Sequence, residues 1–98
     1  MSNTDDDFFS RADAHIRLSN DQMSETATRG KVSASMMYAT ARFNAWVTAC
    51  GWKNAEEMAA AKDETVAYFV AEYQKMLEEN LSDYVTHFDD YMRPRSQG

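Results

Sequence analysis

Glycine, proline and cysteine are all scarce in this sequence, and each shortage excludes a class of protein. The chain has three glycines and one proline among 98 residues, whereas sandwiches and barrels need turn residues at about every eighth to twelfth position. A single cysteine, Cys50, cannot form an internal disulfide and is typical of a reducing compartment. These shortages predict an all-α protein in the cytoplasm.

The sequence also lacks an export signal and a long hydrophobic run. Three consecutive acids, Asp5 to Asp7, stand where a secretory signal would need a basic stretch followed by an apolar one. Arg42 and Asn44 interrupt the most apolar stretch, so no window approaches the roughly eighteen apolar residues of a membrane span. We therefore expect neither export nor a membrane partner.

Apolar and aromatic residues, in contrast, are plentiful. Hydrophobic residues make up 44% of the chain, and they include seven methionines, five tyrosines, five phenylalanines and two tryptophans. This content is too apolar for an intrinsically disordered protein. Because the length suits one core, the prediction is a single helical domain over residues 1–98.

Capping signals and apolar spacing predict where the first two helices lie. Apolar residues recur at three- to four-residue spacing over 5–27, where Thr4 can cap the helix. A second helix is expected over 33–50, with Ser33 as its N-cap. Gly51 follows it and suits the left-handed position that often ends a helix.

The third helix has the clearest start. Asn54, with Glu57 three residues later, forms an Asn-led capping box, and a helical period then runs over 55–92. Residues 93–98 are expected to fray. Phe69 and Tyr73 lie where all three helices should overlap, so the pattern predicts them as core residues.

The predicted helices differ in length, and this difference suggests self-association. A helix over 33–50 is roughly 26 Å long, whereas one over 55–92 would be roughly 57 Å long. The overhang is apolar, and exposing it would leave a patch larger than soluble monomers usually tolerate. Either the helix breaks near 80–82 and folds back, or a second chain covers it, and the absence of glycine and proline at 80–82 favours the second chain. The fold class predicted is a three-helix domain completed as a bundle by oligomerisation, most simply a homodimer, and its predicted interface residues are Leu77, Leu81, Tyr84, Phe88 and Tyr91.

Charge is distributed unevenly along the chain, whose net charge is −6. The segment 11–53 holds six basic and three acidic residues, whereas the chain from Asn54 onward holds ten acids and four bases. Opposite charge balances favour packing of one half against the other, within a chain or between chains.

One group of residues has the spacing of a metal site. Asp83 and Asp90 lie four residues before and three residues after His87, so the three share one face of a helix. A divalent metal is one interpretation, and a solvated acidic face with an incidental histidine is the other, because a single helix rarely closes a tetrahedral site. His15 lacks neighbours at ligand spacing and is expected to be an ordinary histidine.

No catalytic pattern accompanies this group. Cys50 lies at a predicted helix C-terminus, where the dipole disfavours a thiolate, so a buried structural thiol is expected. The chain contains neither a Gly-x-Ser-x-Gly motif nor a Gly-rich phosphate loop. The sequence therefore predicts no enzyme and no cofactor.

Nucleic-acid binding has little support either. Arg29 and Lys31 lie between the first two predicted helices, but Arg42 is the only base within the second one. A helix that reads DNA would present polar and basic side chains, and the acidic third helix would repel phosphate. We expect no nucleic-acid partner.

Three segments resemble an uncharacterised family of small bacterial proteins, classed as a domain of unknown function. They are 11–15, 32–45 and 68–84, and the resemblance extends over most of the chain. It implies a bacterial helical protein without an assigned activity, and no catalytic or ligand residue follows from it. Two hypotheses remain: a structural or protein-interaction module that self-associates and can receive a further protein partner, and a small ligand- or metal-binding protein that uses the His87 face.

Overall fold

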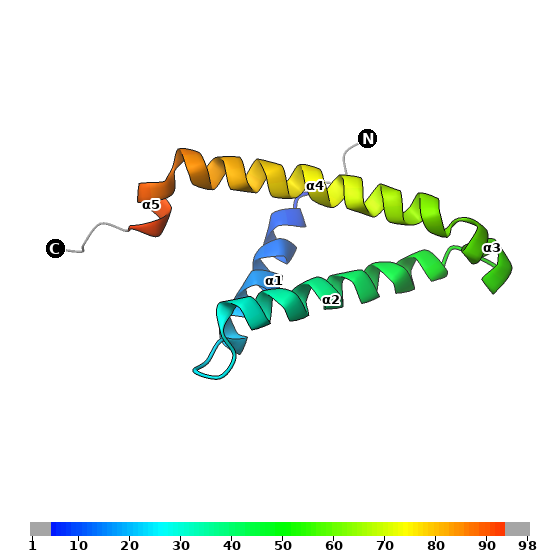
Figure 1. The fold of residues 1–98 in the computed structure, drawn as a ribbon, viewed down its shortest axis with the longest axis horizontal. Coiled ribbons are helices and arrows are strands. Elements are labelled where there is room, and N and C mark those ends of the chain that lie inside the picture. Colours follow the sequence, from blue (N-terminus) through cyan, green and yellow to red (C-terminus); the bar gives the residue numbers. More distant parts are fainter. Residues whose placement is uncertain (1–4, 94–98) are drawn as a thin grey trace. The chain divides into compact units, whose positions relative to one another are not determined.

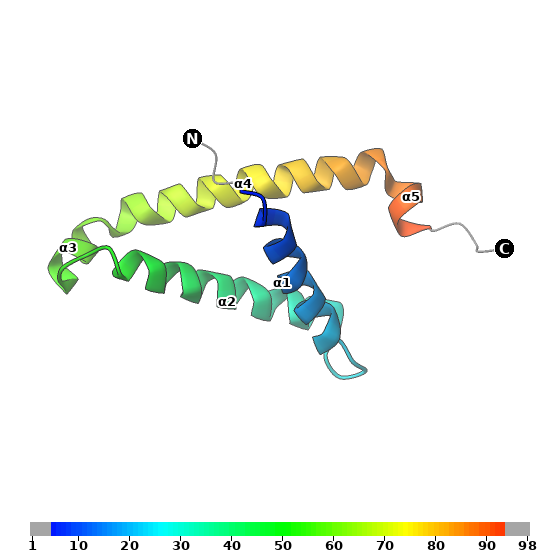
Figure 2. The ribbon, with the colours of Figure 1, turned by 180° about the vertical axis from the view of Figure 1, so that it is seen from behind.

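The structure is a computed structural model that describes residues 5–93, and this part of the chain is helical (Figures 1 and 2). No strand occurs within these residues, which confirms the predicted all-α class. The chain divides into two compact units, Met1–Gly51 and Trp52–Gly98. The first unit contains two of the helices and the second contains three: α1 (Phe8–Gln22), α2 (Arg29–Ala49), α3 (Ala55–Ala60), α4 (Lys62–Thr86) and α5 (Phe88–Met92).

Helix α1 ends at Gln22, five residues before the predicted end at 27. The reason lies in the connection that follows. The Ser24 hydroxyl oxygen accepts hydrogen bonds from the backbone amides of Thr26 (3.3 Å) and Ala27 (3.0 Å). Serine side chains that bond to nearby backbone groups offer an alternative to the helix, so they favour turns.

Helix α2 begins four residues before the expected start, so the prediction that Ser33 is its N-cap was wrong. Thr28 is the residue before the helix, with extended backbone (φ −74°, ψ 170°), and its carbonyl accepts the Val32 amide at 3.0 Å. The predicted left-handed Gly51 was wrong too, because Gly51 does not adopt a positive φ. Its amide bonds instead to the Thr48 carbonyl at 3.0 Å in a tight, right-handed turn.

The first unit has a very small core. Within residues 5–93, Val32 on α2 is the only hydrophobic side chain that is buried, at 4% exposure. Nearby, the Ser19 hydroxyl of α1 donates a hydrogen bond of 3.2 Å to the Met36 sulfur of α2. Contacts between α1 and the N-terminal part of α2 thus hold this unit together.

In the second unit, the helix predicted over 55–92 is in fact three helices. Its start is confirmed, because the Asn54 side chain accepts a hydrogen bond of 2.9 Å from the Glu57 amide. The first break is at Ala61 (φ −96°, ψ 3°), whose amide is shared between the Glu57 and Met58 carbonyls. The second break is at His87 (φ −116°, ψ 30°).

The break that was considered near 80–82 does not occur, and α4 runs through these residues. The Asn80 side chain donates a hydrogen bond of 2.7 Å to the Met76 carbonyl one turn earlier. With 21 residues in α2 and 25 in α4, the two helices are roughly 32 Å and 38 Å long. The difference in length is therefore much smaller than the sequence predicted.

Within the described residues of the second unit, Phe69 and Tyr73 do not form a buried core. Phe69 is half-buried and Tyr73 is exposed. The single domain over residues 1–98 stays a prediction, and the predicted cap Thr4 and most of the predicted tail (94–98) lie outside the described residues. None of the helices within 5–93 is both long and apolar enough to cross a membrane.

Candidate functional site

The most extensive feature of the second unit is an apolar row on α4. Its members follow one another at alternating spacings of four and three residues, which keeps them on one side of the helix. Every apolar member is exposed, from 41% at Leu77 to 59% at Val70. We name this set the α4 row: Val66, Val70, Tyr73, Leu77, Asn80 and Tyr84.

The five predicted interface residues extend this row past the second helix break. Leu77, Leu81 and Tyr84 belong to α4, whereas Phe88 and Tyr91 belong to α5. All five side chains are exposed, and Leu81 is 57% exposed. The centroids of the Tyr84 and Tyr91 rings lie 4.9 Å apart in an edge-to-face arrangement. An aromatic contact therefore links α4 to α5 across the second helix break.

The helices that carry most of the exposed apolar side chains also carry opposite charges. Helix α2 contains three basic residues and no acid, whereas α4 contains six acids and two bases. On α2 the exposed aromatic side chains include Tyr38, Phe43 and Trp46. Each helix therefore presents an apolar surface together with a charge that the other helix complements.

The residues predicted to bind a metal come together only in part. The His87 Nδ1 atom lies 3.2 Å from a carboxylate oxygen of Asp83 and 3.2 Å from the Asp83 carbonyl oxygen. Asp90 lies in the first turn of α5, beyond the helix break. No group of three or more His, Cys, Asp or Glu side chains within residues 5–93 is arranged to hold a metal ion. The metal site stays a prediction.

Tyr91 joins the same group. A hydrogen bond to the Asp83 carboxylate is the main cause that raises the pKa of the Tyr91 hydroxyl above its ordinary value. The Tyr91 ring also lies 5.5 Å from the His87 ring. Asp83 thus has two partners near the end of α4: His87, which the spacing predicted, and Tyr91, which it did not.

The remaining sequence candidates are separate from this group. His15 is exposed on α1. Cys50, which was expected to be a buried thiol, is exposed. The expectation was wrong because Cys50 lies just after the last residue of α2, in the turn that leads out of the unit.

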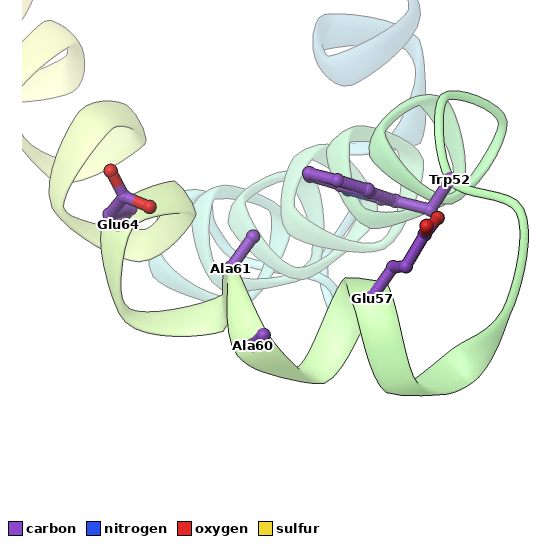
Figure 3. Close-up of a pocket in the computed structure, with 5 residues that line it drawn as sticks. All are labelled: Trp52, Glu57, Ala60, Ala61 and Glu64. Carbon is purple, nitrogen blue, oxygen red and sulfur yellow. The ribbon is translucent and has the colours of Figure 1, made fainter.

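A shallow hollow lies beside α3, and the sequence pattern did not predict it. The hollow has a volume of about 330 Å³. Trp52 forms one wall, Ala60 and Ala61 form the floor, and Glu57 and Glu64 contribute carboxylates (Figure 3). An indole face flanked by carboxylates suits a cationic group better than an anionic one. The signal in the sequence was Trp52, two residues before the Asn54 cap, which places the indole beside the first turn of α3.

Comparisons with known proteins agree with the resemblance seen in the sequence. Residues 8–85 match the family described as "Protein of unknown function (DUF3144)". The chain is also similar to the NMR structure of the protein NB7890A from a Shewanella species, with 38% sequence identity and a TM-score of 0.74. That similarity covers 97% of this chain and 100% of the Shewanella chain. No protein with a curated description matches.

Proposed function

Because the chain belongs to this bacterial family of proteins of unknown function, we propose its role from its own surface: it is a helical module that forms a homodimer, in which α4 and α5 of each copy pack against α2 of the other. The observation that carries this proposal is the exposed α4 row and its continuation at Phe88 and Tyr91. Soluble monomers seldom leave so long an apolar stripe in water.

Two features support a second copy of this chain as the occupant. The acidic α4 complements the basic α2, so α4 of one copy finds a matching surface on α2 of the other. In a two-fold dimer this contact occurs twice, with the same pair of surfaces each time. Association then buries the exposed apolar side chains of both helices, and this removal of apolar surface from water is the dominant favourable term in association.

Sedimentation equilibrium at micromolar concentration tests the proposal. The native chain should sediment as a dimer, and a Leu81→Glu/Phe88→Glu variant should sediment as a monomer, because each added carboxylate would be buried without a partner. The control is Ala71→Glu/Ser82→Glu, which adds the same charge on the side of α4 away from the row. This control should remain dimeric.

A native chain that sediments as a monomer would refute the proposal. A dimer that both variants leave intact would place the interface elsewhere. Added salt should weaken the native dimer only modestly, since salt screens the exposed charges but leaves apolar contacts in place. The single exposed thiol of Cys50 supports a reducing compartment, so we place the dimer in the cytoplasm.

A further inference from the structure

The hollow beside α3 has an apolar centre between two acidic ends. The Trp52 indole and the methyl groups of Ala60 and Ala61 form the centre, whereas Glu57 and Glu64 each contribute a carboxylate. In Figure 3 the indole extends over Ala61, with Glu57 on one side and Glu64 on the other. All five residues belong to the second unit, so this unit alone forms the hollow.

The helix break at Ala61 keeps the two carboxylates on different helices. Glu57 lies in α3 and Glu64 lies in the first turn of α4. The Glu57 carboxylate also accepts a hydrogen bond of 3.1 Å from the Lys53 amide through Oε1. This bond orients the Glu57 side chain and uses one of its two carboxylate oxygens, so the other oxygen can accept from a ligand.

Neither carboxylate is neutralised within the part of the chain that the structure describes. The ion pairs among residues 5–93 involve other acids and do not include Glu57 or Glu64. A cation at either end of the hollow therefore meets an uncompensated negative charge. The apolar centre, in contrast, offers nothing to a charged or strongly hydrated group.

We propose that the hollow binds an α,ω-alkanediamine, a linear molecule with an ammonium group at each end, as in the short polyamines. One ammonium donates hydrogen bonds to Glu57 and the other donates to Glu64. The methylene stem between them lies on Ala60 and Ala61, against the Trp52 indole, which also attracts a nearby ammonium through its ring face. The volume of about 330 Å³ is at the lower end of the range for small-molecule sites and suits a short diamine.

Other cations use less of this surface. A metal ion prefers oxygen ligands around it and leaves the indole and the alanine floor unused. A quaternary ammonium lacks the N–H groups that a carboxylate accepts, and it is typically held by a cage of several aromatic rings rather than by one indole. A single ammonium, such as that of a lysine side chain, satisfies only one of the two carboxylates. The layout therefore selects a molecule with two charges and an apolar stem.

This inference goes beyond the proposed dimer, because none of the five residues belongs to the α4 row. The test is an NMR titration of the full chain, at constant ionic strength, with putrescine and with its longer homologue cadaverine. The chain has two tryptophans, so the indole N–H of Trp52 is the reporter and that of Trp46, on α2, is the internal control. A Trp46→Phe variant assigns the two signals. The Trp52 signal should shift saturably with a diamine, and the Trp46 signal should not.

Matched monoamines and variants test the two-ended contact. The monoamines n-butylamine and n-pentylamine keep the stem but lose one ammonium, so each should bind about two- to fivefold more weakly than its diamine. Glu64→Gln should lower the diamine affinity by a similar factor of about two to five and remove the advantage over the monoamine. Glu79→Gln makes the same charge change later on α4, at another exposed position, and should bind like the native chain. Far-ultraviolet circular dichroism verifies that both variants fold.

Three results would overturn the proposal. The first is a Trp52 signal that neither diamine moves, or that magnesium chloride moves equally, since the latter would reflect a general acidic surface. The second is equal binding of each diamine and its matched monoamine, which would indicate a site for a single cation. The third is a Glu64→Gln variant that binds both diamines as the native chain does. The oligomeric state measured by sedimentation affects none of these outcomes.

Discussion

The Asn54 side-chain oxygen accepts a hydrogen bond of 2.9 Å from the Glu57 backbone amide, and the Glu57 carboxylate in turn accepts one of 3.1 Å from the Lys53 amide. Two amides at the start of α3, which would otherwise lack a partner within the helix, are satisfied by two side chains. This exchange also holds the Glu57 carboxylate at the rim of the Trp52 hollow.

Asn54→Ala should lower the free energy of unfolding by roughly 1 kcal/mol, because the Glu57 amide loses its acceptor. Asn54→Asp keeps an acceptor and should be nearly neutral. Urea denaturation measures both. Equal effects of the two substitutions would show that the side chain of residue 54 does not cap the helix.

Ser33→Ala distinguishes the observed start of α2 from the one that the sequence predicted. Ser33 lies inside the helix, where alanine has a higher helix propensity, so the substitution should stabilise by about 0.5 kcal/mol. A loss of about 1 kcal/mol, the cost of removing an N-cap, would contradict the observed start. The thermal unfolding midpoint gives the sign.

Val32→Ala should destabilise by about 2 kcal/mol, since it removes two buried methyl groups from the small core of the first unit. Thr40→Ala is the matched control on the same helix: its side chain is exposed, and the change should stay within about 0.5 kcal/mol. Equal losses for the two variants in urea denaturation would mean that contacts other than those around Val32 stabilise this unit.

Tyr91 should ionise at a higher pH than an ordinary tyrosine, because its hydrogen bond to Asp83 favours the neutral hydroxyl and raises its pKa. A raised pKa in the folded state means that the contact stabilises the protein below the ordinary tyrosine pKa of about 10, and that this contribution is lost as the pH rises through the folded value. In Asp83→Asn the Tyr91 pKa should return towards the ordinary value. The ultraviolet absorbance of tyrosinate, compared with Tyr91→Phe, isolates this group.

Zinc should bind weakly, because the structure brings only Asp83 and His87 together as candidate ligands and a closed zinc site needs four. Added zinc should shift the ring signals of His87 and leave those of His15 unchanged, and a chelator should not alter the unfolding midpoint. Zinc that survives gel filtration and is lost in Asp90→Asn would instead establish the three-residue site.

The errors in the predicted helix ends share one physical cause. Apolar periodicity is a property of many residues and survives a local break, so it joined α3, α4 and α5 into one helix. The actual end of α1 depends instead on a local side-chain bond, in which the Ser24 hydroxyl accepts the Ala27 amide. The sequence shows which residues carry side chains that can accept such a bond. It does not show whether a backbone amide will bond within the helix or to one of those side chains.

The sequence by itself determined the all-α class, the start of α3 and the position of the apolar row, because periodicity and a cap three residues from its acceptor are local properties of the chain. Only the tertiary structure decided that Val32 is buried while Phe69 is half-buried and Cys50 exposed. It also decided that Tyr91, beyond a helix break, joins the Asp83–His87 pair that the spacing predicted. Burial and such contacts depend on where the chain bends in three dimensions, and a bend of one residue redirects every side chain that follows it.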